Sequence, residues 1–148
     1  MSKKLFHIMS LFVLLGVLLA LSVSAVAAQS LPTVTIRATD PFAKEATDKG
    51  QFTVYRSPSS ASLSPLTVYY IVGGTAANGV DYVTLTGTVT IPGGAVSAPI
   101  IVTPREDTVR ELPETVIVKI TDPCFGPTGC IYNIGTPSSA TVTIYDND

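Results

Sequence analysis

The chain has 148 residues, 46% hydrophobic and 14% charged, so it is long enough for one globular domain and too short for two of full size. Its formal net charge is −2 and its basic residues are not clustered, which argues against a nucleic-acid partner. The only histidine is His7, near the start of the chain. The rest of the chain therefore lacks the imidazole that His-dependent serine and cysteine hydrolases and His-ligated zinc sites require.

Residues 1–28 have the three-part layout of a secretory signal peptide. Lys3 and Lys4 precede a long apolar run, and small residues follow it up to Ala28. Cleavage after Ala28 would leave a domain over residues 29–148 and direct it to the cell surface or the medium. The alternative is a retained membrane anchor, because the apolar run approaches the length of a spanning helix.

Two cysteines flank a short segment that contains glycine and proline. Cys124 and Cys130 have five residues between them. In an exported chain, cysteines on either side of such a turn usually join, so we predict a disulfide that fixes the turn. A redox-active pair is disfavoured, because the spacing is not Cys-x-x-Cys and no base lies nearby in the sequence.

From residue 33 onward, apolar and polar residues alternate with period two, and turn residues recur about every ten positions. No segment has the pattern of an amphipathic helix. Seven strands are predicted: Thr33–Ala38, Gln51–Arg56, Leu66–Val72, Gly87–Ile91, Ser97–Thr103, Thr115–Ile120 and Ala140–Ile144. The third is apolar on both faces, which suits a strand covered on both sides. Together they predict an all-β fold, a seven-stranded antiparallel immunoglobulin-like β-sandwich.

Antiparallel order predicts where the acidic residues gather. Successive strands run in opposite directions, so alternate loops lie at the same end of the sandwich. The loops over residues 39–50, 73–86 and 104–114 and the C-terminal tail therefore share one end. Only Asp122 lies at the other end, and ten acids fall at the first: Asp40, Glu45, Asp48, Asp81, Glu106, Asp107, Glu111, Glu114, Asp146 and Asp148.

Like charges gathered at one end repel each other unless a counter-ion lies between them. Calcium takes several oxygen ligands in flexible geometry, whereas softer metals favour His and Cys. Magnesium requires a tighter octahedron, so calcium fits better. The alternative is that these acids are solvated and that Arg105 and Arg110 pair with some of them.

Several ordered motifs resemble those of Calx-beta domains: Gly73–Ala76, Gly79–Tyr82, Gly87–Gly94, Glu111–Thr115 and Ala140–Asp148. The resemblance covers the chain from about Thr33 to its last residue. This family includes modules in the regulatory loop of sodium/calcium exchangers, in an integrin tail and in many bacterial secreted or surface proteins. The resemblance implies a β-sandwich that binds calcium at one end.

By this resemblance the calcium ligands are seven of the ten acids: Glu45, Asp81, Glu106, Asp107, Glu111, Asp146 and Asp148. The chain departs from the family pattern at Glu106, where Asp is more usual, at Thr108, which replaces a further acid, and at the neutral Asn147. These departures imply a lower affinity or fewer ions. Other roles are expected for the remaining three acids, with Glu114 supporting the loop or starting a strand and Asp40 and Asp48 solvated.

Glycines and tyrosines near these acids have structural roles in this interpretation. Gly79 follows Asn78 in a turn that requires positive φ, and Gly73 and Gly74 leave a strand where no side chain would fit. Tyr82 is expected to pack in the core.

The sequence thus predicts a secreted, non-enzymatic module that binds calcium ions and has a structural, adhesive or interaction role. The first alternative is a metal-free extracellular module that binds a protein partner through its exposed strands or the Ser57–Ser64 loop. The second is a carboxylate-pair enzyme, with Glu111 and Glu114 as acid and base on a sugar. Nothing in the sequence indicates a substrate cleft for that activity. Contact with a membrane is expected only through a retained leader.

Overall fold

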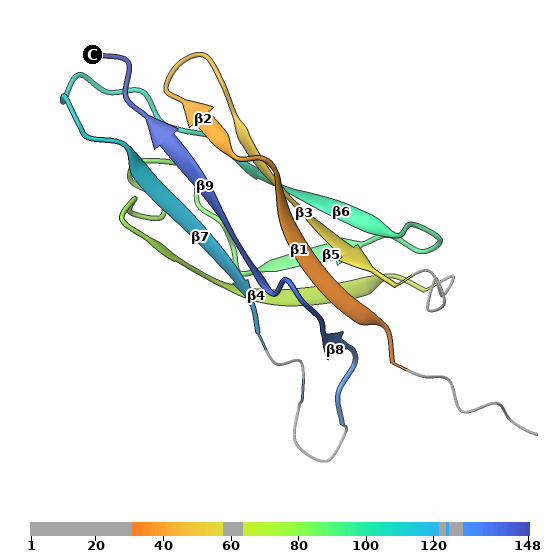
Figure 1. The fold of residues 1–148 in the computed structure, drawn as a ribbon. Coiled ribbons are helices and arrows are strands. Elements are labelled where there is room, and N and C mark those ends of the chain that lie inside the picture. Colours follow the sequence, from red (N-terminus) through yellow and green to blue (C-terminus); the bar gives the residue numbers. More distant parts are fainter. Residues whose placement is uncertain (1–30, 58–63, 122–123, 125–128) are drawn as a thin grey trace, which may run out of the picture.

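The computed structural model describes residues 31–57, 64–121, 124 and 129–148. They form two β-sheets that face each other (Figure 1). One sheet has the strand order β6-β3-β1-β8 and the other the order β2-β9-β7-β4-β5. The strands are β1 (Thr33–Asp40), β2 (Phe42–Lys44), β3 (Gly50–Arg56), β4 (Leu66–Gly74), β5 (Thr88–Ile91), β6 (Ser97–Val102), β7 (Glu114–Ile120), β8 (Asn133–Ile134) and β9 (Ser139–Tyr145).

All seven predicted strands are present, with bounds that differ from the prediction by at most two residues. The prediction of seven strands in a purely antiparallel sandwich was wrong, because β2 and β8 are additional. β2 pairs in parallel with β9, and β8 pairs in parallel with β1. Strands of three and two residues are too short to show a period-two pattern, so sequence analysis missed them.

The change of sheet between β1 and β2 has a local cause. The register of β1 with β3 shifts between Ala38 and Asp40, and Pro41 follows. Proline has no backbone N–H to donate, so the ladder with β3 ends there. The Pro41 carbonyl instead accepts a hydrogen bond from the Thr143 N–H at 2.9 Å, and the chain continues as β2 beside β9.

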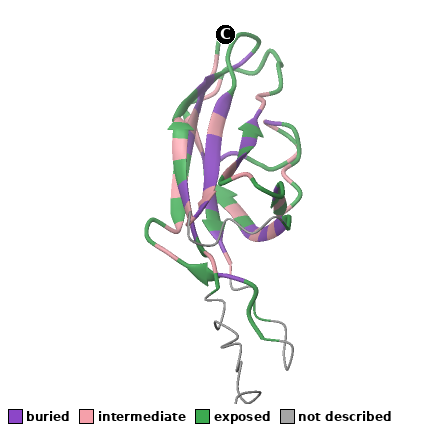
Figure 2. Ribbon diagram, turned by 90° about the vertical axis from the view of Figure 1, so that its right-hand side faces the viewer, coloured by how far each residue is buried: buried purple, intermediate pink, exposed green. Residues whose placement is uncertain are grey.

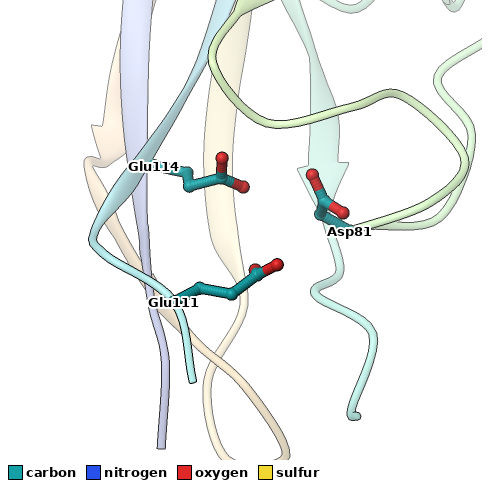
Figure 3. Close-up of side chains that lie close together, drawn as sticks. All are labelled: Asp81, Glu111 and Glu114. Carbon is teal, nitrogen blue, oxygen red and sulfur yellow. The ribbon is translucent and has the colours of Figure 1, made fainter. Parts of the chain in front are cut away.

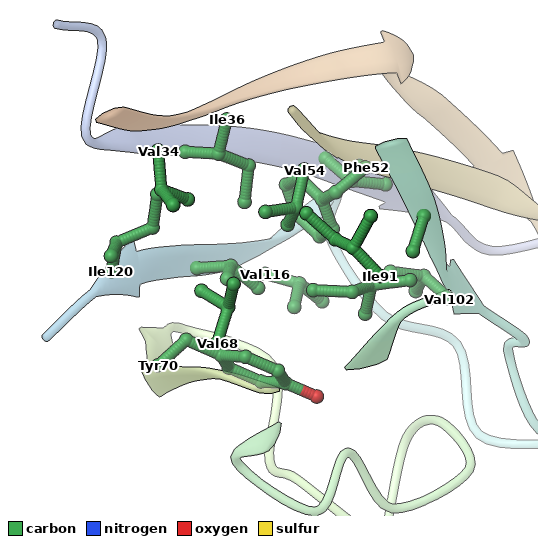
Figure 4. Close-up of a cluster of buried hydrophobic side chains, with 14 of the residues drawn as sticks. Val34, Ile36, Phe52, Val54, Val68, Tyr70, Ile91, Val102, Val116 and Ile120 are labelled. Carbon is green, nitrogen blue, oxygen red and sulfur yellow. The ribbon is translucent and has the colours of Figure 1, made fainter. Parts of the chain in front are cut away.

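The core lies between the sheets and is built from alternate residues of each strand (Figure 4). Ile36 and Phe52 come from one sheet, and Val68, Val116 and Val118 come from the other; all five are fully buried. Burial of each such side chain stabilises the fold by roughly 1.5–3 kcal/mol. Tyr82 is also fully buried, as predicted.

Strand β4 is covered on one side only, which corrects the prediction of a strand buried on both. Val68 and Tyr70 face the core, whereas Ile71 points outward and is 57% exposed. Figure 2 shows this alternation of buried and exposed positions along the strands. The β-branched side chains on the outer face reflect strand propensity and not burial.

Of the two glycines at the end of β4, only Gly74 is required by its surroundings. It has φ of 113°, and an added Cβ would overlap the carbonyl oxygen of Thr115 at the start of β7. Gly73 has no atom near its Cβ position, so the prediction that a side chain would not fit there was wrong. Gly79 has φ of 86°, as its turn requires.

The predicted disulfide between Cys124 and Cys130 is present. It follows the end of β7 that lies away from Glu114 (Figure 1). The predicted leader lies outside the described residues, as do Asp122 and most of the serine-rich loop. Among the residues described, no helix is long and apolar enough to cross a membrane.

Candidate metal centre

Four segments meet at one end of the sandwich, which we call the acidic pole: the β2–β3 turn, the β4–β5 loop, the β6–β7 loop and the tail after β9 (Figure 1). Backbone hydrogen bonds tie them together. The Arg105 N–H donates to the Asp81 carbonyl at 2.8 Å, and the Glu45 N–H donates to the Tyr145 carbonyl at 3.1 Å. The predicted gathering of these loops is therefore correct.

Three carboxylates of the acidic pole converge, and we call them the inner cluster: Asp81, Glu111 and Glu114. One oxygen of each lies within 4.8 Å of one oxygen of the other two. Figure 3 shows the three side chains pointing toward a common space: Asp81 from the β4–β5 loop, Glu111 from the segment that leads into β7, and Glu114 from the start of β7. This spacing suits a shared cation.

Asp81 is held in place by the turn that precedes it. The Ala77 N–H donates to Asp81 Oδ2 at 2.6 Å, and the Asp81 N–H donates to the Ala77 carbonyl at 3.1 Å. Gly79 supplies the positive φ inside this turn. This turn thus holds the Asp81 carboxylate in the inner cluster.

Glu114 is a member of the inner cluster that the sequence interpretation did not include among the candidate ligands. It does start β7, as expected, but its carboxylate also belongs to the inner cluster. The period of the strand explains this: Val116 and Val118 face the core, and Glu114 lies on the same face two residues earlier. Extending the inward face of β7 backward from Val116, its first inward apolar residue, would have identified Glu114.

The pKa of Glu114 responds to its charged neighbours. Burial raises the pKa of Glu114, and its hydrogen bond to Asp81 and the charges of Asp81 and Glu111 raise it further. The raised pKa of Glu114 thus reflects a concentration of negative charge in the inner cluster, which a cation would neutralise.

Glu45 is the most deeply buried acid of the pole, with 4% of its surface exposed. Ala43 faces the core and Lys44 is exposed, so the alternation of β2 turns Glu45 inward. Its Oε2 atom is buried and has no hydrogen-bond partner. A buried carboxylate oxygen without a partner is costly unless a cation binds it.

The pKa of Glu45 shows which acids surround it. Burial raises this pKa most, and the charges of Asp146, Asp107, Glu106 and Glu111 raise it further. Glu111 responds similarly, because partial desolvation and the charges of Asp81, Asp107 and Asp146 raise its pKa. Six of the seven predicted ligands, all but Asp148, thus interact as one group of charges.

Asp146 has the opposite electrostatic character. Its Oδ1 accepts a hydrogen bond from the Asp148 N–H at 3.0 Å, and its Oδ2 accepts one from the Glu111 N–H at 2.8 Å. These two bonds lower its pKa, and the charge of Arg110 adds to the effect. Asp146 is therefore a stable anion that joins the C-terminal tail to the β6–β7 loop.

The other predicted ligands, Glu106, Asp107 and Asp148, have exposed side chains. Asp107 Oδ1 accepts a hydrogen bond from the Val109 N–H at 2.7 Å, which shapes the loop. Glu106 accepts from the side-chain amide of Asn147, and both Glu106 and Asp148 are exposed.

Two acids of the same end stand apart from this group. Asp40 and Asp48 are not among the charges that act on Glu45 or on the inner cluster. Asp40 lies at the register shift at the end of β1, and Asp48 is exposed. Across the described ranges, no salt bridge joins a carboxylate of the pole to Arg105 or Arg110, although the charge of Arg110 helps to lower the pKa of Asp146.

The donor set is chemically uniform. The described side chains at this pole offer carboxylate oxygens and no imidazole or free thiol, since the only histidine is His7 and both cysteines are joined elsewhere. Such a set suits a hard cation, and the orphan oxygen of Glu45 is consistent with one.

The fold and the pole together define a two-sheet β-sandwich module with an acidic loop end. The family model of the Calx-beta domain matches residues 28–148. The chain therefore belongs to the Calx-beta family, which confirms the resemblance noted in its motifs.

Solved structures agree with this assignment. The apo form of the Calx CBD1 domain has a TM-score of 0.57 and 23% identity, and the match covers 78% of this chain and 98% of that one. CBD12 from CALX1.2 has a TM-score of 0.59 and 22% identity, covering 78% of this chain. The calcium binding domain CBD12 of CALX1.1 has a TM-score of 0.56 and 23% identity, covering 76% of this chain.

The chain spans 44% of the length of each CBD12 structure. At these identities the likeness to solved structures shows the fold alone. No curated protein matches the chain.

Proposed function

We propose that the acidic pole binds calcium and that the protein works as an extracellular calcium-stabilised module. The observation that carries this proposal is the orphan Oε2 of Glu45, buried among the charges of Asp146, Asp107, Glu106 and Glu111. A cation bound there would supply the missing partner and cancel the repulsion. A similar solved structure, CBD12 of CALX1.1, is named a calcium binding domain, which also favours calcium as the ion.

The proposed ligands are Glu114 and five of the seven acids predicted from the sequence: Glu45, Asp81, Asp107, Glu111 and Asp146. Asp81, Glu111 and Glu114 would supply an inner set of oxygens, because they already converge within 4.8 Å. Glu45, Asp107 and Asp146 would complete it, because the charges of Asp107 and Asp146 act on both Glu45 and Glu111. Glu106 acts on Glu45 but not on the inner cluster, and together with Asp148 it would lie at the exposed rim of the site. Calcium is favoured over magnesium, because ligands from four separate segments suit flexible coordination.

Ion binding would hold the four segments of the pole together. Asp146 and Asp148 directly follow β9, so a bound ion would connect the end of that strand to the β6–β7 loop. We propose that this stiffening serves a structural or adhesive role outside the cell. The disulfide at the opposite end supports an oxidising compartment.

Thermal unfolding during a calcium titration of metal-stripped protein tests the proposal. A ligand at 100 times its Kd stabilises the folded state by about 2.7 kcal/mol, so a saturable rise in Tm is expected. Magnesium should give a smaller rise. The variant Asp81→Asn/Glu111→Gln should lose the response to calcium.

The matched control is Asp40→Asn/Asp48→Asn, which removes the same charge from the same end but outside the group of interacting acids. It should keep the full response. A Tm that stays flat through millimolar calcium would overturn the proposal and favour the metal-free interaction module. An equal loss of response in both variants would show a general charge effect in place of a site.

A further inference from the structure

The C-terminal tail places a neutral side chain between two acids. Asn147 lies between Asp146 and Asp148, and its Nδ2 reaches both carboxylate oxygens of Glu106, at 3.2 Å to Oε1 and 3.4 Å to Oε2. Glu106 lies on the β6–β7 loop, 41 residues away in sequence. A long-range contact of the tail thus covers the carboxylate at the exposed rim of the pole.

This contact competes with metal binding at the same atoms. Calcium binds oxygen, and both oxygens of Glu106 face an N–H donor. An amide also brings no negative charge to the pole. The hydrogen bond of Asn147 therefore gives Glu106 a neutral partner, while Glu45 Oε2 has none.

We infer that Asn147 keeps Glu106 out of the calcium coordination and thereby sets the calcium affinity of the pole. The inference rests on the proposed function, since it concerns the same ion site. It assigns the ion to the inner cluster together with Glu45, Asp107 and Asp146. Asn147 is then the residue that limits the calcium affinity of the pole.

Replacing the amide by a carboxylate reverses both effects. Asn147→Asp removes the N–H donor from Glu106 and adds a negative charge beside it, so the two carboxylates repel each other until a cation binds. Calcium affinity depends on the number of charged ligands, so we expect the Kd of the variant to be about tenfold lower than that of the wild type. In chelator the Tm of the variant should be lower than that of the wild type.

Isothermal titration calorimetry with calcium chloride on the metal-stripped chain measures this directly. Glu106→Gln alone should change the Kd by less than about twofold, because the Gln side-chain carbonyl still accepts from Asn147 and no bound ligand is lost. The double variant Asn147→Asp/Glu106→Gln should lose the gain. Asn133→Asp adds the same charge on the exposed strand β8 and should match the wild type.

The outcomes separate this inference from the proposed function. If the wild type binds no calcium, the proposed function fails first. If the wild type binds calcium and Asn147→Asp leaves the Kd unchanged, the inference alone is wrong. It is equally wrong if Glu106→Gln weakens binding as much as Asp107→Asn, because Glu106 would then already be a ligand. Chelator melting curves of each variant establish that it is folded.

Discussion

Glu45 and Asp146 show how two carboxylates of one pole acquire opposite properties from their partners. Asp146 accepts two backbone N–H bonds, which lower its pKa and keep it ionised. Glu45 is buried, has one orphan oxygen and faces four other acids, all of which raise its pKa. The first carboxylate stabilises the loop without an ion, and the second destabilises it until a cation or a proton arrives.

Glu45→Gln therefore has effects of opposite sign with and without calcium. In chelator the substitution removes a buried charge from a repulsive field, so we expect stabilisation of about 1 kcal/mol, or a rise in Tm of about 4 °C. In saturating calcium the same variant loses a ligand, so its calcium-induced rise in Tm should be smaller than that of the wild type. Differential scanning calorimetry under both conditions measures the two effects.

The control for this prediction is Asp48→Asn, which removes a charge on the same turn from an exposed carboxylate. It should change the Tm by no more than about 1 °C, both in chelator and in saturating calcium. A lower Tm for Glu45→Gln in chelator would contradict the view that its charge is destabilising in the absence of an ion.

At the scale of elements, the close approach of β4 and β7 positions the inner cluster. Gly74 ends β4 beside Thr115, and the backbone N–H of Thr115 donates to Thr75 Oγ1 at 2.8 Å. Glu114 immediately precedes Thr115, so its carboxylate depends on this contact. Because Gly74 has no side chain, β7 can approach β4 closely enough to place Glu114 in the inner cluster.

Gly74→Ala should weaken both the fold and the site. Its φ of 113° disfavours any L side chain, and the new Cβ would overlap the Thr115 carbonyl. We expect a loss of about 2–3 kcal/mol in the free energy of unfolding and a weaker calcium response. Urea unfolding in chelator and in calcium measures both.

Gly73→Ala is the matched control, because no atom lies near its Cβ position. It should change stability by less than about 0.5 kcal/mol. Equal effects of the two substitutions would show that backbone flexibility of the glycine pair, and not the contact with Thr115, matters at this corner.

For the whole molecule, concentration of charge at one pole couples folding to pH. The pKa values of Glu45, Glu111 and Glu114 are raised, first by desolvation and then by neighbouring acids. An acid with a raised pKa binds protons more tightly in the folded state than in the unfolded state. Its contribution to stability is complete below the unfolded value of 4.5 and is lost as pH rises through the folded value.

The calcium-free protein should therefore become more stable as the pH falls from about 7 toward about 5. Asp146 acts in the other direction, because its lowered pKa makes its contribution disappear as the pH falls below 3.8. A maximum of Tm at mildly acidic pH is expected in metal-stripped buffer. In saturating calcium the trend should reverse, because protons compete with the ion.

Melting curves at several pH values, with and without calcium, test this coupling. Asp81→Asn/Glu111→Gln should make the Tm less dependent on pH, whereas Asp40→Asn/Asp48→Asn should leave that dependence unchanged. A Tm that falls steadily from neutral to mildly acidic pH in chelator would show that the acids of the pole do not repel one another in the folded state.

Much of this architecture follows from local sequence pattern. Alternation predicted every long strand, because inward and outward positions follow the two-residue period of the backbone. The glycine at position 79 predicted its turn. Strand β2 was not predicted, because its three residues form a strand only by pairing with β9, which is distant in sequence.

The candidate site, too, was predictable from the sequence only in part. The order of strands alone predicted that the acids of four separate segments meet at one end, because antiparallel neighbours reverse direction. The sequence by itself thus determined the fold class, the composition of the acidic pole and the family. Only the tertiary structure decided that Glu114 joins Asp81 and Glu111, that Glu45 is buried with an orphan oxygen, and that Asn147 covers Glu106. Whether a carboxylate is solvated, hydrogen-bonded or left without a partner depends on what packs over it, and those neighbours come from distant parts of the chain.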